Sequence, residues 1–287
     1  MTRPAYLTEE AIAQFIQAAF REDMGEGDHS TLATVPVHKK AKAKLLVKDE
    51  GVLAGAALAE KIFHQVDKDL SVTFFKNDGD TVRRGETAFE VSGSARAILS
   101  AERLVLNCMQ RMSGIATQTN RLSKLIEGTS AQLMDTRKTT PNFRLMEKWA
   151  VAIGGGRNHR FALYDMIMLK DNHVDVAGGI SMAVAAAKKY LSEENKNLQI
   201  EVETRNLNEV KEALSTHGVD VILLDNMNLS EMKEAVKLIA GKCKTEASGG
   251  ITEATLRSVA ECGVDYISVG ALTHSIKSLD LSLKVFE

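Results

Sequence analysis

Positive charge collects in one stretch of a chain that is nearly neutral overall. Between Arg137 and Lys170 there are seven Lys or Arg residues and two acidic ones, whereas the whole chain has a formal net charge of -2. The basic residues are Arg137, Lys138, Arg144, Lys148, Arg157, Arg160 and Lys170. Guanidinium groups pair with carboxylates and phosphates through two parallel hydrogen bonds, and lysine supplies a mobile point charge. These cations and His159 therefore favour a pocket for a ligand with several negative charges, although a solvated basic face is the simpler alternative.

Not every cation of this stretch is expected in the pocket. Arg137, Lys138 and Lys170 follow apolar runs, and Arg157 to Arg160 follows three glycines, Gly154 to Gly156. Arg144 and Lys148 are four residues apart on a predicted helix, so we expect both at the surface. The glycines match neither a Walker loop nor GxGxxG and favour a tight backbone turn.

Acidic residues mark two further predicted strands. In the run Ile200 to Glu203, Glu201 and Glu203 share one face of a strand, and Asp225 ends the next strand along the chain. If that face is the functional one, Glu203 and Asp225 bind Mg2+ or stabilise a developing positive charge. The alternative is that these acids form structural ion pairs with the nearby cations.

Glycine-containing turns follow the last two predicted strands. Ser248, Gly249 and Gly250 precede one helix, and Gly270 follows the next strand. Backbone amides at helix N-termini bind anions, and the last loops of an α/β barrel often hold a phosphate. We therefore favour a phosphate site over ordinary turns.

After Gly128, predicted strands alternate with predicted helices, and these elements must position the residues named above. Apolar runs alternate with amphipathic helices, which predicts a parallel sheet, either doubly wound or closed into a barrel. Polar residues end strand after strand, and a barrel brings all such ends to one mouth, so a barrel is favoured. Before that region, short strands and one helix near residues 57–66 precede a long helical stretch, residues 94–126, that Gly114 interrupts. A domain boundary is expected near this stretch.

The composition excludes several functional classes. With a pI of about 6.4, no general surface for nucleic acid or an anionic membrane is indicated. The three cysteines, Cys108, Cys243 and Cys262, form neither a disulfide framework nor a zinc pattern. No signal peptide and no apolar run of about 18 residues is present, so a cytoplasmic enzyme is expected.

Several ordered motifs resemble one known family. They are EDMGEGDHST, ERLVLNCMQRMSGIAT, DTRKTTPNFR, GGGRNHR, LKDNH, EVE, LLDN, EASGGIT and SVGALTHS, and they extend over roughly residues 20 to 280. The chain is similar in these motifs to quinolinate phosphoribosyltransferase. The resemblance implies an N-terminal α/β sandwich domain, residues 1–115, against which residues 276–287 pack, and a TIM-like α/β barrel of six or seven strands, residues 116–275. It also implies a homodimer or a hexamer of dimers.

The implied reaction joins quinolinate to 5-phosphoribosyl 1-pyrophosphate with Mg2+. The products are nicotinate mononucleotide, pyrophosphate and carbon dioxide, in de novo NAD synthesis. Carried over by motif, the quinolinate carboxylates are held by Arg137, His159, Arg160 and Lys170, with Arg103 of the partner subunit. Lys138 and Lys170 face the pyrophosphate, Glu203 and Asp225 the ribose and Mg2+, and Ser248, Gly249, Gly250 and Gly270 the 5-phosphate. The catalytic residues are then Lys138, Glu203 and Asp225, and whether Glu201 shares the role of Glu203 stays open.

Three other functions compete with this one. The first is a homologue of altered role, associated with molybdenum transport. The second is an aldolase barrel in which Lys170 or Lys138 forms a Schiff base. The third is a binding module without turnover.

Overall fold

The structure is a computed structural model and describes residues 4–286. The chain forms two compact units. The first contains Met1–Asn120, Thr139–Gly155 and Ala271–Glu287, and the second contains Arg121–Lys138 and Gly156–Gly270. The boundary that the sequence predicts at residue 115 lies inside one long helix, α4 (Ala95–Leu125).

The first unit is built on a four-stranded antiparallel sheet. Its strands lie in the order β12 (Leu281–Val285), β1 (Lys40–Val47), β5 (Thr87–Ser94) and β3 (Ser71–Phe74). The helices of this unit are α1 (Glu9–Met24), α2 (His29–Thr34), α3 (Ala56–Val66), the greater part of α4, α5 (Arg144–Ile153) and α11 (Ala271–His274). A short ribbon of β2 (Gly51–Val52) and β4 (Thr81–Val82) completes it.

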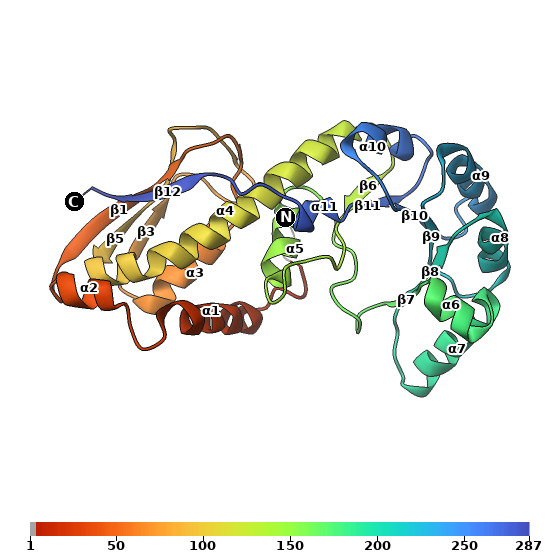
Figure 1. Ribbon diagram of the computed structural model, residues 1–287, viewed down its shortest axis with the longest axis horizontal. Coiled ribbons are helices and arrows are strands. Elements are labelled where there is room, and N and C mark those ends of the chain that lie inside the picture. Colours follow the sequence, from red (N-terminus) through yellow and green to blue (C-terminus); the bar gives the residue numbers. More distant parts are fainter. Residues whose placement is uncertain (1–3, 287) are drawn as a thin grey trace. The chain divides into compact units, whose positions relative to one another are not determined.

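Side chains along the strands of this sheet alternate between buried and more exposed positions, so one face of the sheet contributes to the core. Along β1, Ala41, Ala43, Leu45 and Val47 are buried, and the residues between them are more exposed. Helix α3 packs on the same sheet, because Phe63 contacts Phe89 of β5 edge to face with ring centroids 5.8 Å apart. The labelled strands and α3 can be followed in Figure 1. Strand β12 pairs with β1, so the last strand of the chain joins the first unit.

Helix α4 is continuous, so the predicted interruption at Gly114 is wrong. Glycine costs a helix interior about 1 kcal/mol relative to alanine, but packing compensates for this cost. A Cβ at position 114 would collide with the backbone carbonyl of Lys277. The absence of a side chain at Gly114 therefore allows the backbone at Lys277 to pack against the helix. Local sequence does not reveal this contact.

The second unit contains a six-stranded parallel sheet. The strands lie in the order β6 (Gln132–Met134), β11 (Tyr266–Ser268), β10 (Lys244–Ser248), β9 (Val221–Asp225), β8 (Ile200–Thr204) and β7 (Ile167–Leu169). Helices α6 (Asp171–Ala177), α7 (Ile180–Glu193), α8 (Leu207–Ser215), α9 (Leu229–Ile239) and α10 (Glu253–Ala260) alternate with these strands.

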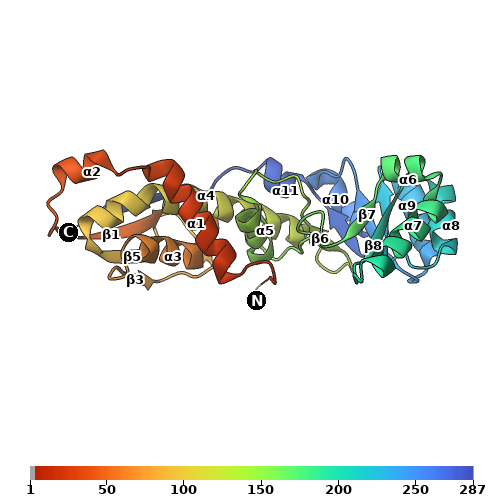
Figure 2. The same cartoon turned by 90° about the horizontal axis from the view of Figure 1, so that it is seen from below.

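This strand order is that of a TIM-like α/β barrel, as the sequence predicts. The first two strands along the chain, β6 and β7, lie at the two ends of the sheet, and Arg157 in the segment between them bridges to Met134 of β6. Figures 1 and 2 show helices α6 to α9 on one side of β7 to β9. All five residues of β8 are buried, as expected for a strand covered on both faces.

The burial of helix α5 corrects one prediction from the sequence. Lys148 is fully buried, not at the surface, and Arg144 is half-buried with its Nε donating to Thr139 Oγ1 at 2.9 Å. Most of the helix is enclosed, since Met146, Glu147, Ala150, Val151 and Ile153 are buried as well. The i, i+4 spacing therefore identified a shared face of the helix but not whether that face meets solvent.

Candidate active site

The strand tips of the second unit bring predicted site residues together. Lys170 ends β7 and Glu203 lies near the end of β8, and Lys170 Nζ donates to Glu203 Oε2 at 2.6 Å. Glu203 is nearly buried, whereas 46% of the Lys170 side chain is exposed. His173 Nδ1 accepts from the backbone N–H of Lys170 at 3.0 Å and fixes the start of α6. The lysine is therefore anchored at its backbone and can exchange its carboxylate partner for a ligand.

The next two tips, those of β9 and β10, also lie side by side. Asp225 is aligned with Ser248 in the parallel ladder, and Asn226 N–H donates to the Ser248 carbonyl at 2.9 Å. Asn226 Nδ2 also donates to Asp225 Oδ2 at 2.8 Å. The sequence placed Asn226 at this tip but gave it no role, and in the structure it ties the two strand ends together.

Glycine is required in the loop after β10. Gly249 has φ +89° and Gly250 has φ +60°, both in the region that L side chains rarely adopt. A Cβ on Gly249 would also overlap the side chain of Asn226. Gly249 thus packs against Asn226, which follows β9. The two glycines present only backbone groups, with no side chains, in this loop.

Asp135, at the tip of β6, organises the basic segment. This carboxylate is fully buried, and its two oxygens accept from Asn158 Nδ2 at 2.6 Å and from the His159 backbone N–H at 2.9 Å. The sequence missed this role, although an aspartate two residues before Arg137, at the end of an apolar run, was a usable signal. Asp135 therefore fixes the backbone that presents Arg160.

In the second unit, the guanidinium group of Arg137 is near enough to influence that of Arg160 electrostatically. Burial and the positive charge of Arg137 both lower the pKa of Arg160, and the acids Glu201 and Asp165 oppose them. Arg160 also donates to the Met166 carbonyl at 3.3 Å. Among residues 4–286, no acceptor reaches the buried Nε of Arg137. A pair of like charges with an unused donor favours a bound anion.

Arg157 is separate from these cations. Its guanidinium lies 5.1 Å from the ring centroid of Tyr266, and it donates to Gln132 at 3.3 Å. Tyr266 and Gln132 are the first residues of β11 and β6. The Arg157 side chain therefore lies at the amino ends of the strands, whereas the strand tips described above are their carboxyl ends.

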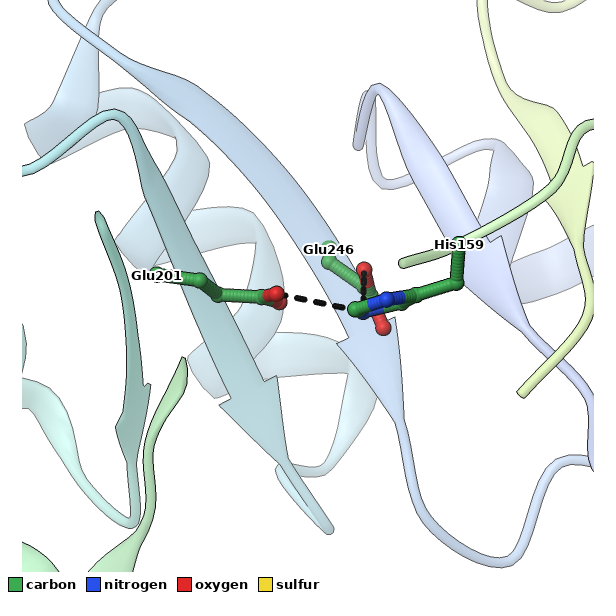
Figure 3. A group of neighbouring side chains, drawn as sticks. All are labelled: His159, Glu201 and Glu246. Carbon is green, nitrogen blue, oxygen red and sulfur yellow. Dashed lines mark ion pairs between the residues drawn. The ribbon is translucent and has the colours of Figure 1, made fainter. Parts of the chain in front are cut away.

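A second group of side chains lies on the same strand faces as the residues at the tips, two residues earlier along each strand. Glu201 is two residues before Glu203 on β8, and Glu246 is two residues before Ser248 on β10, and both are fully enclosed. Figure 3 shows His159 directed at these two acids. His159 Nε2 lies 3.1 Å from Glu201 Oε2 and 3.4 Å from Glu246 Oε2. Below them is a cavity of about 120 Å³, whose lining includes Gln199, Val221, Lys244 and Tyr266, at or next to the amino ends of strands.

The buried acids influence where protons reside. Burial raises the pKa of Glu201, and the nearby His159 opposes that effect. Burial lowers the pKa of His159, and the nearby carboxylates of Glu201 and Glu246 raise it. The backbone N–H of Arg160 acts against a second ring proton, because it donates to His159 Nδ1 at 2.6 Å. We therefore assign the ring proton to Nε2, facing the carboxylates.

This tautomer bears on whether the cluster holds a metal ion. The three ligand atoms lie within 4.8 Å of one another, which is close enough for metal coordination. However, a ligating imidazole needs a lone pair on Nε2 and commonly donates its other N–H. Here Nδ1 accepts instead, so the geometry favours a ring paired with its two neighbouring carboxylates over a metal site.

For the other site residues predicted from the sequence, the structure gives a position and contacts of backbone groups. Lys138 is exposed just beyond the tip of β6, and its backbone N–H donates to Thr136 Oγ1 at 3.0 Å. Gly270 directly follows Val269, whose N–H donates to the Met134 carbonyl of β6 at 3.0 Å. Arg103 is exposed on α4 in the first unit, and its predicted action across a subunit interface stays a prediction.

Comparisons with known proteins agree on one family. The C-terminal and N-terminal domain models of quinolinate phosphoribosyl transferase match residues 115–284 and 28–113. The chain is 48% identical to the chloroplastic nicotinate-nucleotide pyrophosphorylase [carboxylating] of Oryza sativa subsp. japonica, over 98% of this chain and 79% of that protein. A probable nicotinate-nucleotide pyrophosphorylase [carboxylating] of Bacillus subtilis is 43% identical over 93% of this chain and 90% of its own length. The crystal structure of NadC from Streptococcus pyogenes has a TM-score of 0.91 and 40% identity, with 100% of both chains covered.

Proposed function

Since the chain belongs to the quinolinate phosphoribosyltransferase family, we infer that it transfers the phosphoribosyl group of 5-phosphoribosyl 1-pyrophosphate to quinolinate. Its products are nicotinate mononucleotide, pyrophosphate and carbon dioxide, in the biosynthesis of NAD. Relatives that are 43% to 48% identical carry the corresponding names.

The observation that carries the substrate assignment is the pair Arg137 and Arg160. The charge of one perturbs the pKa of the other, and Arg137 Nε is buried without an acceptor among residues 4–286. A pyridine dicarboxylate supplies two anionic groups to such a pair, and bidentate guanidinium contacts fix its orientation. Lys170 contributes a third cation once it leaves Glu203. In this proposal, Arg103 of the partner subunit completes the carboxylate site.

The chemistry follows from charge. Cleavage of the bond between C1 of the ribose and the pyrophosphate builds positive charge on the sugar, and Glu203 and Asp225 stabilise that charge. Lys138 and Lys170 offset the charge on the departing pyrophosphate, and the pyridine nitrogen attacks C1. Loss of the 2-carboxylate as carbon dioxide leaves its electron pair on C2, where the adjacent positive ring nitrogen stabilises it, and C2 then takes a proton from water. Decarboxylation therefore depends on orientation more than on an added acid or base. The mechanism needs no covalent nucleophile.

Mg2+ fits the donors at the tips of β8 and β9. Glu203 and Asp225 offer hard carboxylate oxygens, and this ion usually combines one or two carboxylates with substrate phosphates and water. We assign both residues to Mg2+, which when bound would neutralise negative charge on the pyrophosphate.

The 5-phosphate is assigned to Ser248, Gly249, Gly250 and Gly270. Support comes from the left-handed φ values of Gly249 and Gly250 and from the clash that any side chain at Gly249 would cause. Glycines leave backbone amides open to the oxygens of a phosphate.

An aldolase is the second candidate, because lysines end or follow two strands. The ion pair between Lys170 and Glu203, 2.6 Å long, disfavours it, since an ammonium group has no free electron pair for attack on a carbonyl. Borohydride trapping with a carbonyl substrate is expected to leave no adduct on Lys170 or Lys138.

The assembly and location of the enzyme complete the proposal. We propose a homodimer or a hexamer of dimers in the cytoplasm, acting on small molecules and not on nucleic acid. No helix among residues 4–286 is long and apolar enough to cross a membrane. Mixing an Arg103→Ala chain with an Arg137→Ala chain tests the shared site, because mixed dimers are expected to regain one intact site and part of the activity. Absence of complementation in proven mixed dimers would place Arg103 in its own subunit's site or outside any site.

The reaction itself is tested by measuring pyrophosphate release from quinolinate and 5-phosphoribosyl 1-pyrophosphate. Turnover is expected with quinolinate and far less with nicotinate, which lacks the second carboxylate. Binding without turnover would favour a non-enzymatic module.

A further inference from the structure

Glu147 is a fully buried acid that the proposed reaction does not use. It lies in the first turn of α5, and its Oε1 accepts from Arg111 Nε at 3.0 Å and from Arg111 Nη2 at 2.7 Å. Two hydrogen bonds from one planar guanidinium group to one oxygen fix the direction of both side chains. A buried carboxylate is costly without such a partner, so the two residues act as one unit.

The segment that follows Lys138 is bound to this pair. Glu147 Oε2 accepts from the Thr140 backbone N–H at 3.0 Å, and Glu147 Oε1 accepts from Thr140 Oγ1 at 2.9 Å. Thr140 Oγ1 in turn accepts from Arg111 Nη2 at 3.3 Å. Thr140 is exposed, so packing of the core does not explain these contacts. They hold the backbone two residues beyond Lys138, which is assigned to the pyrophosphate.

The segment that follows Gly270 is bound to the same guanidinium group. Arg111 Nη2 donates to the Thr273 carbonyl at 2.6 Å, and Thr273 is fully buried in α11, which begins directly after Gly270. Gly270 is assigned to the 5-phosphate. Arg111, Thr140, Glu147 and Thr273 all belong to the first unit. One arginine therefore holds two segments, distant in sequence, that each directly follow a residue assigned to 5-phosphoribosyl 1-pyrophosphate.

We propose that Arg111 and Glu147 are positioning residues for 5-phosphoribosyl 1-pyrophosphate, which act by holding the segments after Lys138 and Gly270 in a fixed arrangement. This inference rests on the proposed function, and neither side chain is assigned a contact with the substrate. Both ends of one molecule must be bound at once, so a displacement of about 1 Å at either end weakens binding of the whole. Arg160 and Lys170, which are assigned to quinolinate, lie outside both segments.

The test uses Arg111→Lys and Thr140→Val. Arg111→Lys keeps the positive charge and removes the planar pair of donors, and Thr140→Val keeps the shape of an exposed side chain and removes its hydroxyl group. KM for 5-phosphoribosyl 1-pyrophosphate is measured by turnover, and quinolinate Kd is measured by calorimetry without the second substrate. We expect this KM to rise about tenfold or more in Arg111→Lys and about fivefold in Thr140→Val, with quinolinate Kd within about twofold in both.

Two further variants serve as controls. Thr140→Ser retains the hydroxyl group and is expected to keep both constants within about twofold of the unaltered protein. Glu86→Gln removes a comparable carboxylate in the first unit, which accepts from Lys76 Nζ at 3.2 Å and from the Arg83 backbone N–H at 2.9 Å. No residue assigned to a substrate adjoins these three, so Glu86→Gln is expected to change neither constant.

A measurement on the unaltered protein complements the variants in case Arg111→Lys folds poorly. Hydrogen exchange followed by NMR is expected to be slow at the Thr140 amide, although this residue is exposed, because the amide donates to a buried carboxylate. Fast exchange there, an unchanged KM in folded Thr140→Val, or an equal loss for both substrates overturns the inference. Absence of turnover in the unaltered protein overturns the proposed function instead.

Discussion

Replacing Gly249 with alanine tests the loop assigned to the 5-phosphate. The left-handed backbone at φ +89° costs a non-glycine residue roughly 1–2 kcal/mol. The new Cβ also overlaps the side chain of Asn226, which must then move away from Asp225, to which its Nδ2 donates. Both the loop amides and the Asp225 carboxylate then move. We expect KM for 5-phosphoribosyl 1-pyrophosphate to rise about tenfold or more, because the groups that hold this substrate lose their geometry.

Gly241→Ala is the matched control for backbone strain. Gly241 lies in the same unit at φ +75°, with no atom within 4 Å of an added Cβ. This variant is expected to lose about 1–2 kcal/mol of stability while both KM values stay unchanged. Steady-state kinetics with each substrate varied in turn, with urea unfolding of both variants, provide the comparison. If Gly249→Ala and Gly241→Ala have the same KM for 5-phosphoribosyl 1-pyrophosphate, the phosphate assignment of the loop is wrong.

The remaining predictions concern binding, packing and reactivity. Arg137→Ala should lose far more than tenfold in turnover, because a desolvated substrate carboxylate stays unpaired; a near-normal rate in the same assay would reject its role. Gly114→Ala should destabilise the protein by about 1 kcal/mol or more despite the better helix propensity of alanine, because the methyl group meets the Lys277 backbone; urea unfolding that shows a gain would contradict this packing. Burial raises the pKa of Cys108 to about 12, so this thiol should resist a thiol reagent at pH 8 until the protein unfolds; rapid labelling in the native state would refute its burial.

The sequence predicted the features that local patterns encode. The alternation of apolar runs and helices after Gly128 gave the parallel strands, and the polar residues at their ends identified the tips where Lys170 meets Glu203. Gly249 and Gly250 both adopt left-handed backbone, and the phosphate site predicted for their loop stays a prediction. Strand ends are predictable because strand length and polarity are both local properties.

Long-range contacts were not predictable in the same way. Gly114 looked like a helix break, because the segment that it contacts, at Lys277, is distant in sequence. Lys148 looked like a surface residue, because helical spacing does not show whether a face meets solvent. Asp135 and Glu246 escaped notice for a similar reason, since their partners on the segment Asn158 to Arg160 lie far along the chain or across the sheet. The available signal was the position of Glu246 two residues before Ser248, which places both side chains on the same face of the strand.

The central claim is that the second unit holds a site for a pyridine dicarboxylate beside an activated sugar phosphate. Its most direct test is the ratio of turnover for quinolinate to turnover for nicotinate, each with 5-phosphoribosyl 1-pyrophosphate and Mg2+, in the unaltered protein. We predict that pyrophosphate release with quinolinate exceeds that with nicotinate by about a hundredfold or more, because nicotinate leaves part of the half-buried arginine pair without a carboxylate. Equal rates with the two acids would contradict the claim.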